Sequence, residues 1–257
     1  MNSKKINTQF VGKKIIAFDT IDSTQIYAKK LAEQGESEGT CVVSAQQTQG
    51  RGRFNRPWYS DRGGLWFSLI LRPVLSPHQA GCISLSMALA VAETIENFCN
   101  LKIYLKWPND IIFLTKENQY KKCGGILTDL NLRGTAIDWL VIGVGMNVNN
   151  IIPLELETKA ISLKMILEKE VNRSQFFEKL LCNIEKQYLL LIQNNFHNIK
   201  LKYLSYHAAP HQEIIILNGE IQRKGTFHDI SDEGALLLRT ENNQIEKFFA
   251  GEITFSI

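Results

Sequence analysis

The segment QGRGRFNRPWYSDRGG at 49–64 cannot form part of a packed core, because four arginines and four glycines fall within its sixteen positions. Apolar stretches flank it on both sides, GTCVVSAQ at 39–46 and GLWFSLILRP at 64–73, and each has the length and composition of a buried strand. The chain must therefore leave one buried strand, form a long cationic loop and return into a second strand. This requirement predicts a β-sheet domain that carries the loop on its surface.

The composition of the loop suits an anionic ligand. Gly50 and Gly52 let the backbone approach a ligand closely and expose consecutive N–H donors. Arg51 and Arg53 add planar forks that match phosphate or carboxylate, and Trp58 can cover a base or close an apolar pocket. A solvated surface loop, or one that contacts nucleic-acid phosphates, has the same composition, and residue types alone leave these alternatives open.

Helical and strand-like patterns fill the chain up to about residue 210, and the clearest helix covers 77–99, where apolar residues recur every three to four positions. From 212 onward, short β-branched segments separated by tight turns replace the helices, as is typical of a small β-barrel. We therefore predict an α+β protein with a mixed β-sheet flanked by helices at 1–210 and a small C-terminal β-barrel domain at 211–257. Within the first domain, strands are predicted at 14–18, 39–46, 64–73, 102–107, 110–114, 121–129 and 135–143, and helices at 24–33, 77–99, 162–168 and 174–194.

The net charge of +3 is too small to indicate a nucleic-acid-binding protein, but its distribution is uneven. Residues 211–257 include 8 acidic and 4 basic residues, a net charge of −4, so the first 210 residues carry +7. We therefore expect an anionic substrate in the N-terminal portion. Five cysteines without a C-x-x-C pair favour a reducing compartment, and neither a signal peptide nor a window of about 18 apolar residues is recognisable. These features predict a cytoplasmic protein without a membrane partner.

Three further stretches combine charged residues with rigid or glycine-rich backbone. KWPND at 106–110 places Asp110 after a proline-fixed bend, which is either a plain turn or part of a site. Lys122 enters an apolar strand, where it either extends to the surface or faces a pocket. IGVGMN at 142–147 lacks the third glycine and the following helix of a dinucleotide motif, so a strand that ends in a tight bend is the simpler interpretation.

Histidine and nucleophile patterns exclude some chemistry. The five histidines have no metal-ligand spacing, and no Ser/His/Asp or Cys/His motif is recognisable, which disfavours nucleophilic hydrolysis. His207 and His211 are interpreted as surface residues at the junction of the two domains.

Taken together, these stretches resemble biotin protein ligase over nearly the whole chain. The β-rich C-terminal segment is similar to the SH3-like barrel of that family. Too few residues precede the first predicted strand for the winged helix-turn-helix of some members, so the resemblance is to the ligase-only form without the N-terminal DNA-binding domain. The matching segments follow the family's order: Ser23-Thr24 at the start of the first helix, Gln47-x-x-GRGR leading to Trp58, KWPND at 106–110, K-x-x-GIL at 122–127 and IGVGMN at 142–147.

The resemblance implies an ATP-dependent biotin–[biotin carboxyl carrier protein] ligase. Biotin and ATP, with Mg²⁺, would give biotinyl-5′-AMP and pyrophosphate. A lysine of the biotin carboxyl carrier protein of acetyl-CoA carboxylase would then attack this mixed anhydride. The resemblance implies no DNA partner for this form; a homodimer is compatible with the sequence, which does not determine the oligomeric state.

The resemblance also implies roles for residues at matched positions, with no residue expected to ligate a metal. Catalytic roles are expected for Lys122, Asp110 and Arg53. Adenylate contacts are expected from Arg51, Arg53, Trp58, Lys122 and Asn147. Biotin contacts are expected from Ser23, Thr24, Gln25, Gln47, Arg51, Gly52, Arg53, Lys122 and Gly125.

Two positions depart from the family pattern. Phe54-Asn55-Arg56 follows GRGR where Arg-Gly-Arg is common, so one glycine and one charge are lost, which is expected to slow loop closure or loosen retention of the adenylate. Gln25 stands where asparagine is usual. The nearest alternative is a lipoate ligase or octanoyl transferase, whose Arg-Gly-Gly resembles Asp61-Arg62-Gly63-Gly64. A nucleic-acid-binding module is the alternative from another class.

Overall fold

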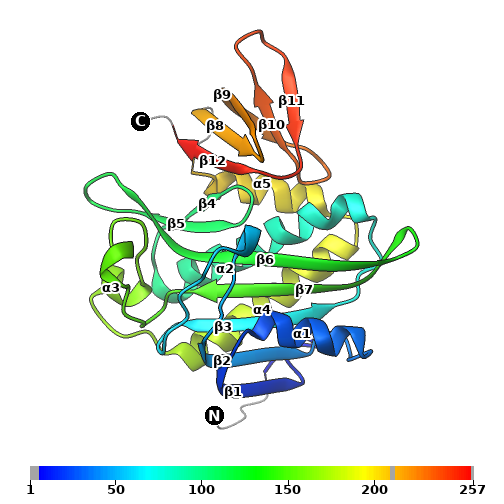
Figure 1. Ribbon diagram of the computed structural model, residues 1–257, viewed down its shortest axis with the longest axis vertical. Coiled ribbons are helices and arrows are strands. Elements are labelled where there is room, and N and C mark those ends of the chain that lie inside the picture. Colours follow the sequence, from blue (N-terminus) through cyan, green and yellow to red (C-terminus); the bar gives the residue numbers. More distant parts are fainter. Residues whose placement is uncertain (1–5, 209–211, 256–257) are drawn as a thin grey trace.

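The computed structural model describes residues 6–208 and 212–255, and its larger part is built on a seven-stranded sheet (Figure 1). The strand order is β1-β2-β3-β7-β6-β5-β4; β1 and β2 run parallel and every other neighbouring pair runs antiparallel. The predicted mixed sheet is therefore confirmed. Its strands are β1 (Ile15–Ile21), β2 (Cys41–Gln47), β3 (Leu65–Leu71), β4 (Tyr104–Lys106), β5 (Asp110–Leu114), β6 (Tyr120–Arg133) and β7 (Ala136–Met146).

Helices cover both faces of this sheet. On one face lies α1, whose Ala28 and Ala32 pack with Val42, Ile70 and Val141. On the other face lie α2 and the helices that pack on it (Figure 1). The helices are α1 (Thr24–Glu33), α2 (Ala80–Cys99), α3 (Leu163–Leu167), α4 (Arg173–Ile192) and α5 (Phe196–Tyr206), of which α5 has no counterpart in the sequence prediction.

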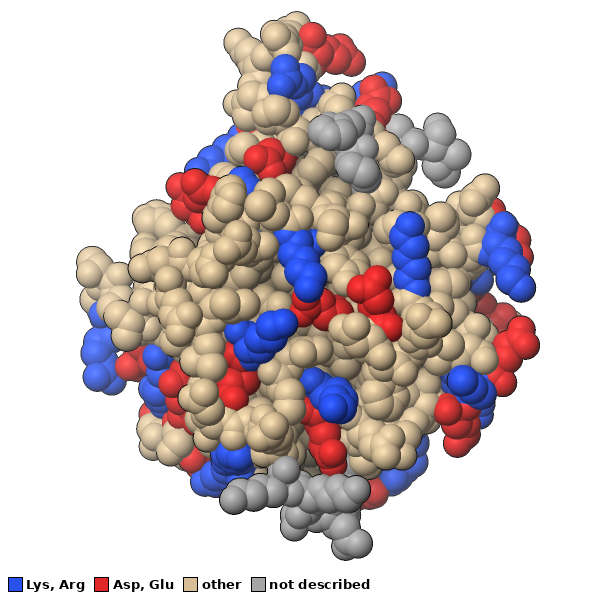
Figure 2. All heavy atoms as spheres, turned by 180° about the vertical axis from the view of Figure 1, so that it is seen from behind, with Lys and Arg blue, Asp and Glu red and all other residues tan. Residues whose placement is uncertain are grey.

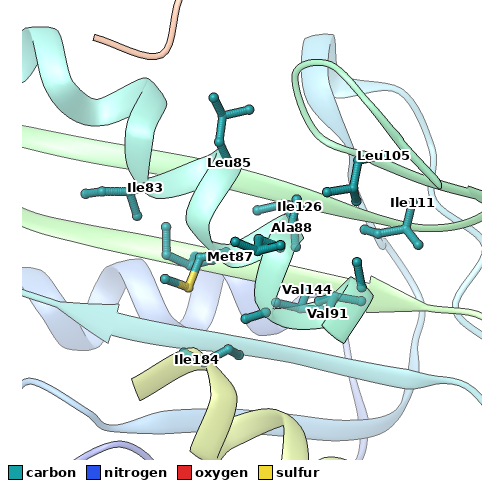
Figure 3. Packing of buried hydrophobic residues seen from close by; sticks show 14 of the residues in the cluster. Ile83, Leu85, Met87, Ala88, Val91, Leu105, Ile111, Ile126, Val144 and Ile184 are labelled. Atoms are coloured by element: carbon teal, nitrogen blue, oxygen red, sulfur yellow. The ribbon is translucent and has the colours of Figure 1, made fainter. Parts of the chain in front are cut away.

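Helix α2 is the centre of the main core. Figure 3 shows Met87 and Val91 of this helix beside Ile126 of β6 and Val144 of β7, and all four are at least 98% buried. Among the described residues, the segment Pro77–Cys99 is long and apolar enough to cross a membrane, although the sequence analysis recognises no such segment. Its mean hydropathy is 1.3 over an 18-residue window, and 72% of that window is buried inside the protein. The burial accounts for the apolar composition, because a core helix needs the same residues.

The side chains of strand β7 point alternately to the two faces of the sheet. Its even-numbered residues, such as Ile142 and Val144, belong to the α2 core, while Val141 packs under α1. Because side chains alternate along a strand, Gly143 and Gly145 fall on the α1 face. Two glycines where side chains would otherwise fill the space leave a hollow beside the N-terminus of α1.

The C-terminal segment forms a second, antiparallel sheet of five strands in the order β11-β10-β9-β8-β12. In the described residues β11 and β12 are the two ends of this sheet, so its closure into a barrel stays a prediction. The predicted boundary between 210 and 211 lies outside the described residues. The strands are β8 (Glu213–Asn218), β9 (Ile221–Ile230), β10 (Leu236–Arg239), β11 (Ile245–Phe248) and β12 (Glu252–Phe255), of which β9 has no counterpart in the sequence prediction.

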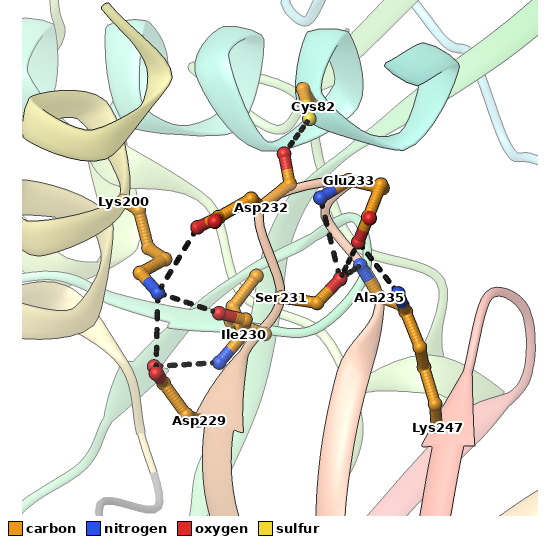
Figure 4. A network of polar contacts seen from close by, with 9 residues as sticks. All are labelled: Cys82, Lys200, Asp229, Ile230, Ser231, Asp232, Glu233, Ala235 and Lys247. Atoms are coloured by element: carbon orange, nitrogen blue, oxygen red, sulfur yellow. Dashed lines mark hydrogen bonds and ion pairs between the residues drawn. The ribbon is translucent and has the colours of Figure 1, made fainter. Parts of the chain in front are cut away.

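Polar contacts join the second sheet to α2 and α5 (Figure 4). Lys200 Nζ of α5 donates to Ile230 O at 2.9 Å and lies 3.2 Å from Asp229 Oδ2. Cys82 Sγ of α2 lies 3.4 Å from Asp232 O. The second sheet is therefore attached to α5 and α2, which also pack with the larger part of the protein.

The interpretation of His207 as a surface residue is wrong. Its side chain is 3% exposed and stacks on Phe227 of β9, with the ring centroids 4.0 Å apart. Burial lowers the pKa of His207 to about 4, because the charged imidazolium loses its hydration. His211 lies outside the described residues.

Candidate active site

A cavity of about 420 Å³ opens on the α1 face of the sheet. It begins at the N-terminus of α1, passes over β7 and β6 and ends under the loop that follows β2. All twelve residues to which the sequence assigns a role line this one cavity: Ser23, Thr24, Gln25, Gln47, Arg51, Gly52, Arg53, Trp58, Asp110, Lys122, Gly125 and Asn147.

The end of the cavity next to α1 is lined by buried, uncharged polar groups. Ser23 caps the helix by accepting from the N–H of Ile26, and Thr24, the first helical residue, is 3% exposed. Gln47 of β2 accepts from both the N–H and the hydroxyl of Thr24, at 2.8 and 3.0 Å. Thr24 also lies 3.0 Å from Ser68 Oγ of β3. We call this region, defined by Ser23, Thr24, Gln47 and Ser68, the polar end.

Glycines on β6 and β7 form the floor of the cavity. A Cβ atom on Gly143 would lie 2.5 Å from Gln25 Oε1, and one on Gly145 would lie 2.7 Å from Trp58 Nε1. Both glycines are therefore required by the side chains that cross above them. Trp58 thus lies against β7, and its buried indole N–H has no hydrogen-bond partner among the residues that the structure describes.

The opposite end of the cavity is cationic. Lys122 Nζ of β6 lies 2.5 Å from Asp110 Oδ1 of β5 and 5.1 Å from the centroid of the Trp58 ring. Lys106 of β4 lines the same region, and its pKa is lowered by burial while the carboxylate of Asp110 raises it. We call this region, defined by Arg53, Lys106, Asp110 and Lys122, the cationic end.

The glycine- and arginine-rich loop covers the cationic end and touches the C-terminal sheet. Arg53 Nη1 donates to Asn109 Oδ1 at 3.3 Å and to Gly251 O at 3.0 Å. Arg56 Nη1 lies 2.6 Å from Glu252 Oε1. Burial lowers the pKa of the Arg53 guanidinium, while nearby Glu252 and Asp110 raise it. Arg51 lies at the exposed rim.

The tip of the loop is where the sequence departs from the family pattern. Phe54 and Asn55 both have φ of 56°, in the left-handed region that favours glycine. Asparagine tolerates this region better than other side chains do, whereas phenylalanine is strained there. The Phe54 ring lies 5.0 Å from the Arg53 guanidinium and 5.8 Å from that of Arg56, and these cation–π contacts offset the strain.

Comparison with known proteins places this cavity in a family. Residues 17–147, which contain all twelve predicted site residues, match the model of the biotin/lipoate A/B protein ligase family, and residues 212–256 match that of the biotin protein ligase C-terminal domain. The chain belongs to the biotin/lipoate A/B protein ligase family. The resemblance to biotin protein ligase predicted from the sequence is thereby confirmed.

Individual family members agree with this assignment. The chain is 36% identical over 254 residues to the bifunctional ligase/repressor BirA of Bacillus subtilis, covering 96% of this chain and 76% of that protein. It is 28% identical over 224 residues to the biotin–[acetyl-CoA-carboxylase] ligase of Paracoccus denitrificans, covering 85% and 91%. The solved structure of the Aquifex aeolicus biotin protein ligase in complex with biotin and ATP matches with a TM-score of 0.81 and 33% identity, covering 95% and 99%.

Several residues that line the cavity of the present protein were not predicted from its sequence. Ser68 and Lys106 look like ordinary strand residues, although Lys106 belongs to the KWPND stretch. Gly143 and Gly145 could have been found from the sequence, because residues two positions apart in a strand lie on the same face of the sheet. Two glycines there leave space on that face. Glu252 comes from the distant C-terminal sheet and completes the cavity only through the tertiary fold.

Proposed function

We propose that the cavity binds biotin with its head at the polar end and its carboxylate at the cationic end, beside the α-phosphate of ATP. The enzyme forms biotinyl-5′-AMP there and passes the biotinyl group to a lysine of the biotin carboxyl carrier protein of acetyl-CoA carboxylase. The observation that carries this proposal is that the twelve predicted residues, from segments as far apart as 23 and 147, surround one cavity.

The polar end favours biotin over lipoate within a family that includes ligases for both. The ureido ring of biotin presents two N–H donors and one carbonyl acceptor, and the dithiolane ring of lipoate presents neither. Thr24 and Gln47 place a hydroxyl and an amide at the polar end. With an apolar head, the Gln47 N–H that is not donated to Ser60 would face a group that cannot accept it, at a cost of roughly 1–3 kcal/mol.

The cationic end suits the first half-reaction. A biotin carboxylate oxygen attacks the α-phosphorus of ATP, a new O–P bond forms, and the bond to pyrophosphate breaks with its electrons. Two anions must meet for this attack, and Arg53, Lys106 and Lys122 stabilise both of them. Trp58 and Asn147, which both line the cavity, are proposed to border the adenine.

Mg²⁺ is proposed to enter with the nucleotide. Among the described residues no three His, Cys, Asp or Glu side chains cluster in a way that could hold a metal ion. The two carboxylates that line the cavity are each paired with a cation, Asp110 with Lys122 and Glu252 with Arg56. The residues therefore do not fit a dedicated metal site, and Mg²⁺ is expected to be held mainly by ATP phosphates.

The second half-reaction uses the same end of the cavity. The carrier lysine attacks the acyl carbon as a neutral amine, an amide bond forms, and AMP leaves with the electrons of the broken acyl–phosphate bond. The nitrogen releases its surplus proton to solvent. Asp110, held by Lys122 at 2.5 Å, is proposed to accept a hydrogen bond from the incoming amine and so to orient it. The reaction needs no covalent enzyme intermediate.

The surroundings of the site support further parts of the proposal. Ile253 and Thr254 of β12 also line the cavity, so we propose that the C-terminal sheet acts as an SH3-like domain that holds the loop over the bound ligands. All five cysteines are free thiols, which supports a cytoplasmic location. Basic and acidic side chains lie beside one another on the face shown in Figure 2, which does not support a nucleic-acid platform.

The decisive experiment is ATP–pyrophosphate exchange by the purified protein. Exchange that depends on biotin, with biotinyl-5′-AMP recovered from the protein, is the expected result. Exchange that depends on lipoate or octanoate and not on biotin would overturn the proposal. Transfer to the carrier is followed separately by the mass increase of an added carrier domain.

A further inference from the structure

The polar end is hydrogen-bonded to an acid that does not line the cavity. Gln25 reaches from α1 across Gly143, and its Nε2 lies 3.0 Å from Asp129 Oδ2 of β6 and 3.0 Å from Val141 O. Lys29 Nζ lies 3.6 Å from the same carboxylate oxygen. A carboxylate thus contacts the network of the polar end from outside the cavity.

The donors and acceptors of this network can be assigned one after another. The carboxylate of Asp129 and the backbone carbonyl are acceptors only, so both hydrogens of the Gln25 amide nitrogen are used, and its Oε1 must accept. Ser68 Oγ lies 2.9 Å from that Oε1 and donates to it. Since a hydroxyl has one hydrogen, Ser68 can only accept toward Thr24 Oγ1, 3.0 Å away.

The other side of the network is fixed independently. Gln47 Oε1 accepts from the backbone N–H of Thr24, which fixes the orientation of the Gln47 amide. Gln47 Nε2 donates to Ser60 Oγ at 2.8 Å, and the Ser60 hydroxyl donates to Trp58 O at 3.0 Å. The single hydroxyl hydrogen of Thr24 therefore goes to Ser68 or to Gln47, both of which accept.

The assignment leaves a defined pattern for a ligand. The oxygen of Thr24 keeps lone pairs that can accept from a ligand N–H, and Gln47 Nε2 keeps one N–H that can donate. If the Gln25 amide turned over, Ser68 would have to accept from it, and its hydrogen would then be directed toward Thr24. Thr24 could in turn donate to a ligand, so the polar end would no longer present Thr24 only as an acceptor.

We propose that Asp129 is a positioning residue that fixes the hydrogen-bond polarity of the polar end for a head group with N–H donors, the class to which cyclic ureas belong. It acts through Gln25 and Ser68 and does not touch the ligand. The inference rests on the proposed function, because it presumes that the head group lies at the polar end. It assigns Gln25 a supporting role in place of the direct biotin contact expected from the resemblance.

Asp129→Asn tests the inference, because an asparagine can offer an N–H as well as an oxygen to Gln25, so that only Val141 O still requires the Gln25 amide nitrogen on its side. We expect the Kd and KM for biotin to rise about tenfold, with kcat and the KM for ATP within about twofold. Desthiobiotin, which keeps the ureido ring, should lose affinity by the same factor. Asp129→Glu keeps an obligatory acceptor and should recover most of the loss.

Two matched variants separate this role from a structural one. Lys29→Met removes the ion pair but keeps the hydrogen bonds, and Asp138→Asn makes the same change at an acid of β7 that pairs with Arg133 at 3.3 Å. Both should bind biotin like the wild type. Unchanged biotin affinity in Asp129→Asn, or an equal loss in Lys29→Met, would overturn the inference. Calorimetry measures the Kd for biotin without turnover. Failure of the proposed function, seen as no ATP–pyrophosphate exchange by the wild-type protein, is therefore distinguished from failure of this inference.

Discussion

The two ends of the cavity are constructed differently. Thr24 and Ser68 at the polar end are 3% and 0% exposed and stand on a helix and a central strand. At the cationic end Arg53 stands on a loop and contacts the C-terminal sheet, and the side chain of Arg56 beside it is 64% exposed. In the proposed function, the head group therefore meets residues that are buried in helix and sheet. The charged groups of the reaction stand partly on an exposed loop, the kind of segment that commonly moves when ligands bind.

The largest expected effect comes from removing a charge at the cationic end. Lys122→Met should lower the rate of biotinyl-5′-AMP formation about 1,000-fold, because a half-buried cationic donor to the developing charge is lost. Biotin affinity without ATP should fall less than about tenfold, since the polar end is intact. Single-turnover kinetics and calorimetry measure the two quantities. Lys121→Met is the control, because Lys121 Nζ donates to Glu157 O, away from the cavity. Equal losses in rate and affinity would contradict the division between the ends.

Removing an arginine from the loop should affect retention of the intermediate. Arg53→Ala loses charge-assisted contacts to the ligand and to Gly251 O, and we expect biotinyl-5′-AMP to dissociate about 100-fold faster. Release of the labelled adenylate from the purified complex gives the rate. Arg62→Ala is a control from the same loop, since Arg62 pairs with the exposed Asp19. An unchanged dissociation rate in Arg53→Ala would mean that the loop does not retain the adenylate.

Most of the twelve residues lie in segments that follow local rules, and their expected roles came from the family resemblance that those segments carry. Ser23 is a helix cap before an apolar period, and the GRGR segment is a loop between two apolar strands. Glu252 could not be found this way, because its contact with Arg56 joins positions 196 residues apart. The burial of His207 likewise could not be predicted, because it depends on contact with β9. This strand is largely polar, and its sequence does not show which of its faces is buried.

Acid should destabilise the fold through His207, which is buried against β9. His207 stacks on β9 with its pKa lowered to about 4 by burial, against an ordinary value of 6.5. As the pH falls below 6.5, the unfolded chain takes up a proton on this histidine while the folded protein does not. The free energy of unfolding is therefore highest above pH 6.5 and decreases as the pH falls from 6.5 toward 4. The loss amounts to about 2 kcal/mol between pH 7.5 and pH 5.

Urea midpoints at the two pH values test this expectation. His207→Phe should lose that part of the pH dependence, whereas His228→Gln, at an exposed histidine of β9, should keep it. If both variants followed the wild-type pH profile, His207 would not be the titrating group.

The smallest expected effect comes from the tip of the loop, where two contributions oppose each other. At Phe54 the left-handed backbone costs roughly 1–2 kcal/mol, and two cation–π contacts return roughly 0.5–1 kcal/mol each. Phe54→Gly removes both contributions and should change adenylate dissociation by less than about threefold. Phe54→Ala keeps the strain and loses the contacts, so dissociation should be about fivefold faster. If biotinyl-5′-AMP dissociated faster from the glycine variant than from the alanine variant, the conformational entropy of the loop, and not strain in its backbone, would control closure of the loop.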